Sequence, residues 1–116
     1  MGFGFRNLGL YQDLRRFTVF LYKIADLFPA KEQFGLRSQL TRCGTSVLLN
    51  FAEGMMSPSA KERGRFLQIS ISSIGEVVAI CDLAFDLQYI PASQHEEILL
   101  QSETVIKRLY GVKRTH

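Results

Sequence analysis

The sequence predicts an all-α protein, an antiparallel up-down-up-down four-helix bundle formed by a single domain over residues 1–116. Three prolines, Pro29, Pro58 and Pro91, divide the chain, and between them apolar residues recur at the three- and four-residue steps of amphipathic helices. No segment shows the sustained alternation of apolar and polar residues that is typical of a half-buried strand. A chain of 116 residues suits one domain, and short connections between four helices favour the up-down arrangement.

The first helix is predicted between residue 7 and Pro29, after a flexible leader at residues 1–6. Asn7 is the expected N-cap, because its side-chain oxygen can accept a hydrogen bond from a free amide of the first turn. The apolar stripe has alternating steps of four and three, which is the seam of a helix packed against near-parallel neighbours. Its members are Leu10, Leu14, Phe17, Leu21, Ile24 and Phe28.

The second helix is predicted around a similar stripe that contains two polar or small residues. Its members are Leu36, Leu40, Cys43, Val47, Asn50 and Gly54. Gly44 lies on the neighbouring stripe and lowers helix stability by about 1 kcal/mol relative to alanine. A close approach of another helix at Gly44 would explain why a glycine stands there.

The third helix is the longest, from about Pro58 to Tyr89. Its start has two possible caps: Ser57 followed by Pro58 at the first helical position, or a capping box of Ser59 and Glu62. Two apolar stripes run along it, so we expect it to be covered on more than one side. In so small a protein, part of that cover is expected to come from another subunit.

The fourth helix is predicted to begin at Ser93, with Glu96 completing a second capping box. Its stripe includes Ile98, Ser102, Val105, Leu109 and Val112. Residues 113–116 are expected to form a basic tail.

Composition excludes several classes of protein. The net charge is +3, and no run of about 18 uncharged apolar residues is present, so we expect no membrane span. The N-terminus lacks a basic stretch followed by an apolar one, so no secretory signal is expected. Two cysteines and two histidines fit neither a disulfide framework nor a zinc site. We therefore expect a cytoplasmic protein without a metal site or cofactor.

Polar residues at predicted seam positions form the first candidate site. We interpret six residues as a structural polar network that fixes helix register: Arg42, Asn50, Glu53, Arg65, Ser73 and Glu76. A buried carboxylate needs a partner, so Glu53 and Glu76 are expected to contact arginine, asparagine or serine. A catalytic carboxylate pair is the alternative. We favour the structural interpretation and expect no enzyme, because no histidine lies near these residues in sequence and no helix carries Glu-x-x-His.

Clustered cations form the second candidate site, a nucleic-acid-binding surface. The predicted members are Arg15, Arg16, Lys107, Arg108, Lys113 and Arg114. The four on the last helix also complement its dipole, which needs no ligand. A charge of +3 is small for a nucleic-acid-binding protein, but symmetric assembly would repeat the patch and add phosphate contacts.

Short motifs spread along the chain resemble a known family. The first half matches at Phe5-Arg6-Asn7-Leu8 with Tyr11-Gln12, then Phe28-Pro29, Phe34-Gly35-Leu36, Gln39-Leu40 and Arg42. The most specific piece is Ser46-x-x-x-Asn50-x-Ala52-Glu53-Gly54, followed by Arg65-Phe66-Leu67 and Ser73-x-x-Glu76. These motifs resemble those of four-helix bundle proteins encoded in intervening sequences of bacterial 23S ribosomal RNA genes, often labelled S23 ribosomal proteins. That family is similar to the accessory variability proteins of diversity-generating retroelements.

The resemblance implies a homopentamer without established enzymatic activity, whose basic surface binds RNA or DNA. The retroelement relatives associate with a reverse transcriptase and its RNA, so a reverse-transcriptase-like partner is a further expectation. Our leading hypothesis is a non-catalytic oligomeric bundle that binds nucleic acid through phosphate contacts. The alternative is a protein-interaction scaffold that does not contact nucleic acid.

Overall fold

A computed structural model describes residues 2–115 of the chain. It contains four long helices: α1 (Gly9–Ala25), α2 (Leu36–Met56), α3 (Ala60–Asp86) and α4 (Ala92–Thr115). Two short 3₁₀ helices, η1 (Gly4–Asn7) and η2 (Ala30–Glu32), precede α1 and α2. No strand occurs among these described residues, which confirms the predicted all-α bundle.

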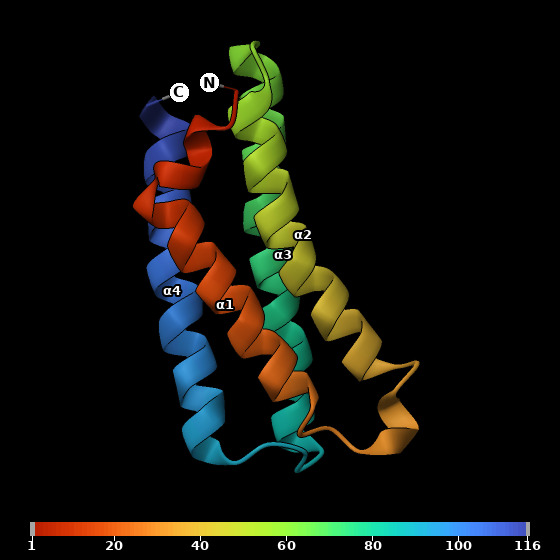
Figure 1. Ribbon diagram of the computed structural model, residues 1–116. Helices are drawn as coiled ribbons and strands as arrows, with labels where there is room; N and C mark the ends of the chain where they lie inside the picture. Colours follow the sequence, from red (N-terminus) through yellow and green to blue (C-terminus); the bar gives the residue numbers. More distant parts are fainter. Residues whose placement is uncertain (1, 116) are drawn as a thin grey trace.

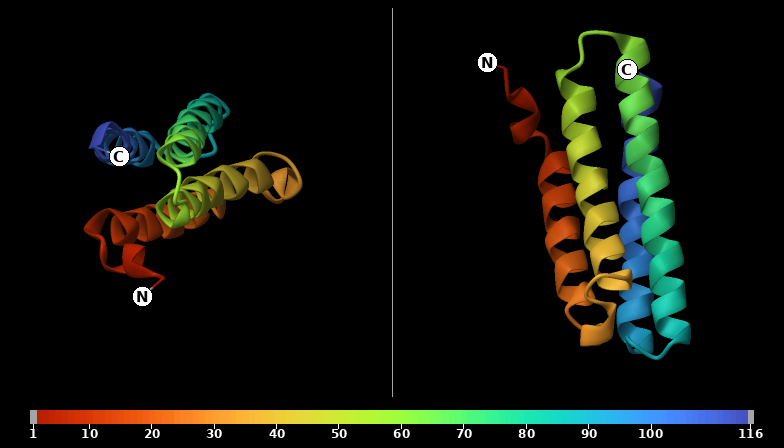
Figure 2. Two further views of the ribbon diagram at one scale, coloured as in Figure 1. Left: turned by 90° about the horizontal axis from the view of Figure 1, so that it is seen from above. Right: turned by 90° about the vertical axis from the view of Figure 1, so that its right-hand side faces the viewer.

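The helices run lengthwise along an elongated molecule, with both chain ends at the same end of it (Figure 1). Its dimensions are 43 × 24 × 22 Å, and the 27 residues of α3 account for about 40 Å of that length at 1.5 Å per residue. α2 packs along α3, while α1 packs on α2 and α4 packs on α3. Seen from above, α1 and α3 lie diagonally across the bundle (Figure 2).

The core is built from the predicted stripes. All six apolar stripe residues of the first predicted helix are buried: Leu10, Leu14, Phe17, Leu21, Ile24 and Phe28. The predicted close approach at Gly44 is also confirmed. A Cβ atom at Gly44 would lie 2.9 Å from Cδ1 of Leu21, so α1 and α2 contact each other where the side chain is absent. At the same level, the hydroxyl of Thr18 donates to the carbonyl of Leu14 at 2.8 Å.

Two helix ends differ from the sequence prediction. The predicted cap at Asn7 is wrong, because Asn7 ends η1 and the extended residue Leu8 precedes α1 without a side-chain cap. α3 stops at Asp86, three residues before Tyr89, because Gln88 has a φ of 65°. The amide of Gln88 donates to the carbonyl of Phe85, and the amide of Tyr89 donates to that of Ala84. This is the hydrogen-bond pattern of a Schellman motif.

Other helix boundaries follow local hydrogen bonds. Ser59 is the N-cap of α3, and its hydroxyl accepts from the amide of Glu62 at 3.3 Å, which confirms Ser59 as the cap over the Ser57–Pro58 alternative. The carboxylate of Glu62 binds Arg65. α4 begins at Ala92, one residue before Ser93, directly after Pro91. The carbonyl of Pro91 accepts from the amides of Gln94 and His95. Ser93 therefore lies inside the first turn of α4, and the predicted start at Ser93 is one residue late.

The two predicted terminal segments are mostly ordered into helix. Residues 4–7 form η1, and the ring of Phe5 lies 5.0 Å from that of Tyr11, edge to face, so the leader packs on α1. α4 continues to Thr115, so Lys113 and Arg114 occupy its last turn and do not form a tail. Met1 and His116 lie outside the described residues.

Within residues 2–115, α3 is the one helix that is long and apolar enough to cross a membrane by length and composition. A core helix of a bundle meets the same criterion, and α3 packs against both α2 and α4. Only 39% of its most apolar window is buried in the single chain, and its exposed side carries Ile69 and Leu83 together with Glu76. The cytoplasmic location stays a prediction.

A candidate nucleic-acid interface

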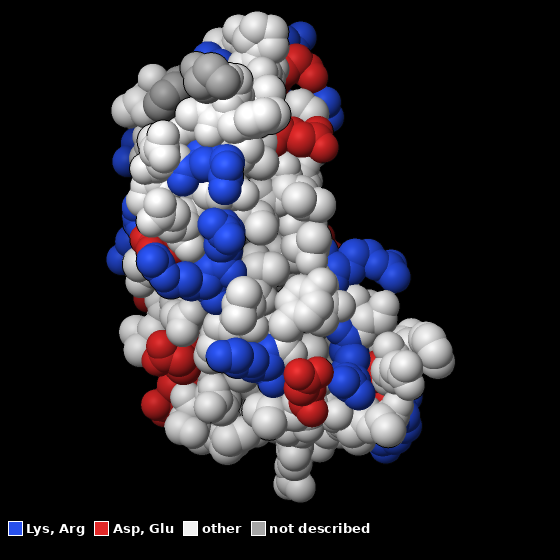
Figure 3. Space-filling model, in the orientation of Figure 1, with Lys and Arg blue, Asp and Glu red and all other residues white. Residues whose placement is uncertain are grey.

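An open, basic groove runs along the outer face of α1. Its volume is about 560 Å³, and six side chains of α1 line it: Gln12, Arg15, Arg16, Val19, Phe20 and Lys23. Residues four apart stack above one another on a helix, so Arg15, Val19 and Lys23 form one ridge. No acidic residue is among these lining side chains. Lys and Arg side chains gather over α1 on this face of the molecule (Figure 3).

Arg15 and Lys23 are the available cations of the groove. Both are exposed, and neither makes an ion pair with any residue that the structure describes. The guanidinium of Arg15 lies 5.8 Å from the ring centre of Tyr11 on the previous turn, within the range of a cation–π contact. Arg15 and Lys23 are eight residues apart, which places them about 12 Å apart along the helix axis.

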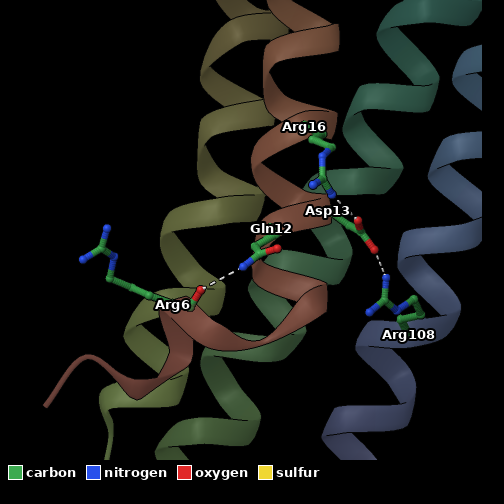
Figure 4. A network of polar contacts seen from close by, with 5 residues as sticks. All are labelled: Arg6, Gln12, Asp13, Arg16 and Arg108. Carbon is green, nitrogen blue, oxygen red and sulfur yellow. Dashed lines mark hydrogen bonds and ion pairs between the residues drawn. The ribbon is translucent and has the colours of Figure 1, made fainter. Parts of the chain in front are cut away.

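Arg16 and Arg108 meet at a shared carboxylate. Nη1 of Arg16 donates to Oδ1 of Asp13 at 2.8 Å, and Nη1 of Arg108 on α4 donates to Oδ2 of the same residue (Figure 4). The Arg108 guanidinium also lies beside Gly9, where an added Cβ would be 3.6 Å from Nη2. All three charged side chains are substantially exposed, and ion pairs of this kind contribute about 0–1 kcal/mol.

The predicted cations do not form one continuous patch. Arg15 and Arg16 share the α1 groove, and Arg108 joins them through Asp13. Lys113 turns toward α3, where its Nζ donates to Oε1 of Gln68 at 2.6 Å. Lys107 and Arg114 are exposed elsewhere on α4.

Two members of this region were absent from the predicted set. Lys23 was detectable in sequence, because it lies two steps of four residues after Arg15. The role of Asp13 could not be detected in the sequence, because its second partner, Arg108, is 95 residues away along the chain.

The predicted polar network exists only in part, between α2 and α3. The hydroxyls of Ser46 and Ser73 are 2.9 Å apart, and Ser73 is buried. Nδ2 of Asn50 donates to the carbonyl of Ser46 at 2.9 Å and contacts its hydroxyl at 3.0 Å. Ser46 thus links Asn50 to Ser73. Ser46 belongs to the family motif of the sequence but was not among the six residues predicted for the network.

The charged members of the predicted network lie at the surface, and Arg42 and Glu53 line the same hollow as Ser46 and Asn50. Glu53 and Glu76 are exposed, so the expectation of buried carboxylates is wrong. Arg65 and Glu76 are 11 residues apart, about 16 Å along α3, which is too far for contact. Arg65 instead pairs with Glu62 at 3.0 Å, and this hydrogen bond and charge raise the pKa of Arg65.

Arg42 and Glu76 make two further contacts, the first within α2 and the second between α2 and α3. Arg42 donates to the hydroxyl of Ser38 at 3.3 Å, one turn earlier on α2. Sγ of Cys43 donates to Oε2 of Glu76 at 3.4 Å. Burial, followed by this hydrogen bond, raises the pKa of Cys43 to about 11, so the thiol stays protonated near neutral pH.

Two further kinds of site were considered, a metal site and a reactive thiol. No group of three or more His, Cys, Asp or Glu side chains that could hold a metal occurs among residues 2–115. Cys81 is buried, and this burial raises its pKa to about 12, which opposes thiolate formation.

The fold and this surface define a small α-helical bundle with a basic groove on its first helix. The sequence matches the family of the 23S rRNA-intervening sequence protein over residues 6–111, and the chain belongs to that family. The family's description refers to an intervening sequence of 23S rRNA and names no enzymatic activity. No curated protein matched the sequence.

Proposed function

We propose that this protein binds RNA without catalysis, through the α1 groove, as an accessory ribonucleoprotein component. The observation that carries the proposal is the groove itself, which offers Arg15, Arg16 and Lys23 with no acid among its lining residues. A row of cations that tracks a helix is suited to a phosphate backbone. The family description, which refers to 23S rRNA, supports RNA as the ligand.

This mode of binding is expected to read little sequence. Arginine and lysine contacts to phosphate fix position and supply affinity, whereas sequence is read from base edges. Gln12 is the uncharged hydrogen-bonding side chain among the groove's lining residues. Affinity is therefore expected to depend on RNA shape and salt more than on the order of bases.

The proposal includes assembly into a homo-oligomer. The uncovered face of α3 runs from Ile69 to Leu83, with Ser72, Glu76 and Ala79 between them, and all five are exposed. Small residues allow another helix to approach closely, and a second copy would bury the apolar ends of this face. The resemblance to ring-forming bundle proteins supports a pentamer, in which phosphate contacts would add across subunits.

The test compares two double variants with equal loss of charge. Arg15→Ala with Lys23→Ala removes the two available cations of the groove. Lys31→Ala with Lys61→Ala removes two cations that lie outside it, on η2 and α3. Fluorescence anisotropy with a labelled structured RNA at low salt is expected to show at least a roughly tenfold weaker affinity for the first variant. Equal affinities for the two variants would contradict the proposal.

A protein-binding scaffold is the second candidate function. An apolar hollow of about 340 Å³ lies where η1 meets the α2–α3 turn, and its lining includes Phe3, Phe5, Met56 and Phe66. Aromatic side chains and methionine are enriched at protein interfaces, so this hollow favours a protein partner such as a reverse-transcriptase-like protein. Copurification of a protein after nuclease treatment, with no affinity of the pure bundle for RNA, would favour this function.

A further inference from the structure

A second groove lies beside the proposed RNA-binding face, between α1 and α4. Its volume is about 400 Å³, and Asp13, Arg16, Gln101, Thr104 and Arg108 are among its lining residues. Arg16 also lines the α1 groove, so this side chain borders both grooves. A backbone bound along α1 therefore passes directly beside the Asp13 carboxylate.

Two carboxylates, Asp13 and Glu97, line this second groove. Glu97 accepts a hydrogen bond from Gln101, whereas both arginines bind Asp13. Arg16 approaches the carboxylate of Asp13 from its own helix, and Arg108 approaches it from α4 (Figure 4). Two guanidinium groups converging on one oxyanion is an arrangement that binds phosphate as well as carboxylate. In this protein the oxyanion between them is a side chain of the chain itself.

We propose that Asp13 competes with RNA phosphate for Arg16 and Arg108, and that the pair binds a phosphate group when this carboxylate is displaced. The inference rests on the proposed function and adds that Asp13 lowers the affinity for RNA. Asp13 neutralises part of the charge that the two arginines would otherwise offer, and its own charge repels a phosphate nearby. The protein would thus bind RNA more weakly than its count of cations allows.

The exposure of the three side chains makes displacement feasible. Arg16 is 73% exposed, and Asp13 and Arg108 are each 41% exposed, so water and salt reach all three. Exposed ion pairs exchange readily with competing ions. The position of α1 depends on its buried stripe, including Leu10, Leu14 and Phe17, so the fold does not require the ion pairs.

The test replaces Asp13→Asn, which keeps the shape of the side chain and removes its charge. The control is Asp86→Asn, which removes the same charge at the last residue of α3, at the opposite end of the bundle from η1 (Figure 1). Affinity for a labelled structured RNA is measured over a range of salt concentrations. Asp13→Asn is expected to bind roughly five- to tenfold more tightly than Asp86→Asn, with a log–log salt slope steeper by about 1.

A double-mutant cycle assigns the gain to the arginines. In the background of Arg108→Gln, the gain from Asp13→Asn should shrink, because one of the two released cations is missing. Thermal melting of each variant checks that the bundle is intact. Equal affinities of Asp13→Asn and Asp86→Asn would overturn the inference, as would weaker binding by Asp13→Asn, which would make Asp13 a positioning residue.

Failure of the proposed function gives a different result. In that case the unmodified protein and all four variants would show no affinity for RNA at any salt concentration. If only Asp13→Asn bound RNA, the competition would be supported in its strongest form. If the unmodified protein bound RNA while Asp13→Asn matched its control, the inference alone would fail.

Discussion

At the scale of single residues, Gly44 shows how a missing side chain positions two helices. Its carbonyl is 3.4 Å from the hydroxyl of Thr18, and a Cβ would lie 2.9 Å from Leu21 on α1. Leu21 is fully buried, so it has little room to move. The contact fixes how closely α1, and therefore the basic groove, lies against α2.

Gly44→Val is expected to lower the free energy of unfolding by about 1–3 kcal/mol, because it overpacks this contact. Gly64→Val is the matched control, since a Cβ at Gly64 would meet no atom within 4 Å. There valine should be neutral or stabilising, because its helix propensity exceeds that of glycine. Chemical denaturation of both variants measures the difference. A loss at Gly64 as large as that at Gly44 would show that packing is not the cause.

Gln88 is the non-glycine residue with a positive φ among the described residues. That conformation costs an L-residue about 1 kcal/mol, and glycine avoids the cost. Gln88→Gly should therefore raise the melting temperature by about 4 °C, while Gln88→Ala should give no such gain. Differential scanning calorimetry distinguishes them, and a lower melting temperature for the glycine variant would contradict this explanation.

The limits of sequence reasoning are visible at the residue scale. Local signals worked: the stripe of α1 from Leu10 to Phe28 and the cap at Ser59 depend on neighbours within a few turns. The roles of Glu76 and Asp13 could not be predicted, because they depend on which helix faces cover each other in space. Glu76 shares a stripe with buried residues of α3, but its side chain is exposed, and its carboxylate accepts from Sγ of Cys43 on α2.

At the scale of elements, the start of α3 depends on one capping side chain. Ser59→Ala removes the acceptor for the amide of Glu62 and should lower stability by about 1 kcal/mol. Asn7→Ala serves as the control, because Asn7 lies before α1 and makes no capping bond in the structure. Urea denaturation should separate the two variants. An equal loss of stability for Asn7→Ala would indicate that Asn7 does cap α1, as the sequence predicted.

The two loops at the base of the bundle are joined by Glu32. Oε1 accepts from the amide of Leu36 at 3.1 Å, and Oε2 accepts from the hydroxyl of Tyr89 at 2.9 Å. These hydrogen bonds, the backbone one first, lower the pKa of Glu32 below its usual value of 4.5. The carboxylate of Glu32 thus links the start of α2 to the α3–α4 connection.

This link should make stability depend on pH. A lowered folded-state pKa contributes stability above the unfolded value of 4.5, which is lost as pH falls through the folded pKa. Glu32→Gln should therefore show a smaller drop in melting temperature between pH 6 and pH 3, values chosen about this pKa. Melting curves over that range test it, and parallel curves for both proteins would exclude a contribution from Glu32.

At the scale of the whole molecule, two surfaces lie diagonally across the bundle. The basic groove is on α1, and the uncovered face with Ile69 and Leu83 is on α3. Because α1 and α3 do not contact each other, a partner on one leaves the other accessible (Figure 2). RNA binding and self-association can therefore occur together.

Assembly through α3 is tested at Ala79, an exposed position within that face. Ala79→Arg should shift the protein toward monomers without loss of helix, because a long charged side chain would enter the proposed contact. Ala30→Arg adds the same charge at an exposed position on η2 and should leave assembly unchanged. Sedimentation velocity and circular dichroism provide the readouts. A folded monomer for the unmodified protein would refute assembly altogether.

The salt dependence of RNA affinity tests the central claim most directly. Three to four phosphate contacts by Arg15, Arg16, Lys23 and Arg108 predict a loss of about 20- to 150-fold in affinity between about 50 mM and 200 mM salt. An oligomer that engages several grooves would lose more. An affinity for structured RNA that stays constant over this range, or that is absent at low salt, would contradict binding through the α1 groove.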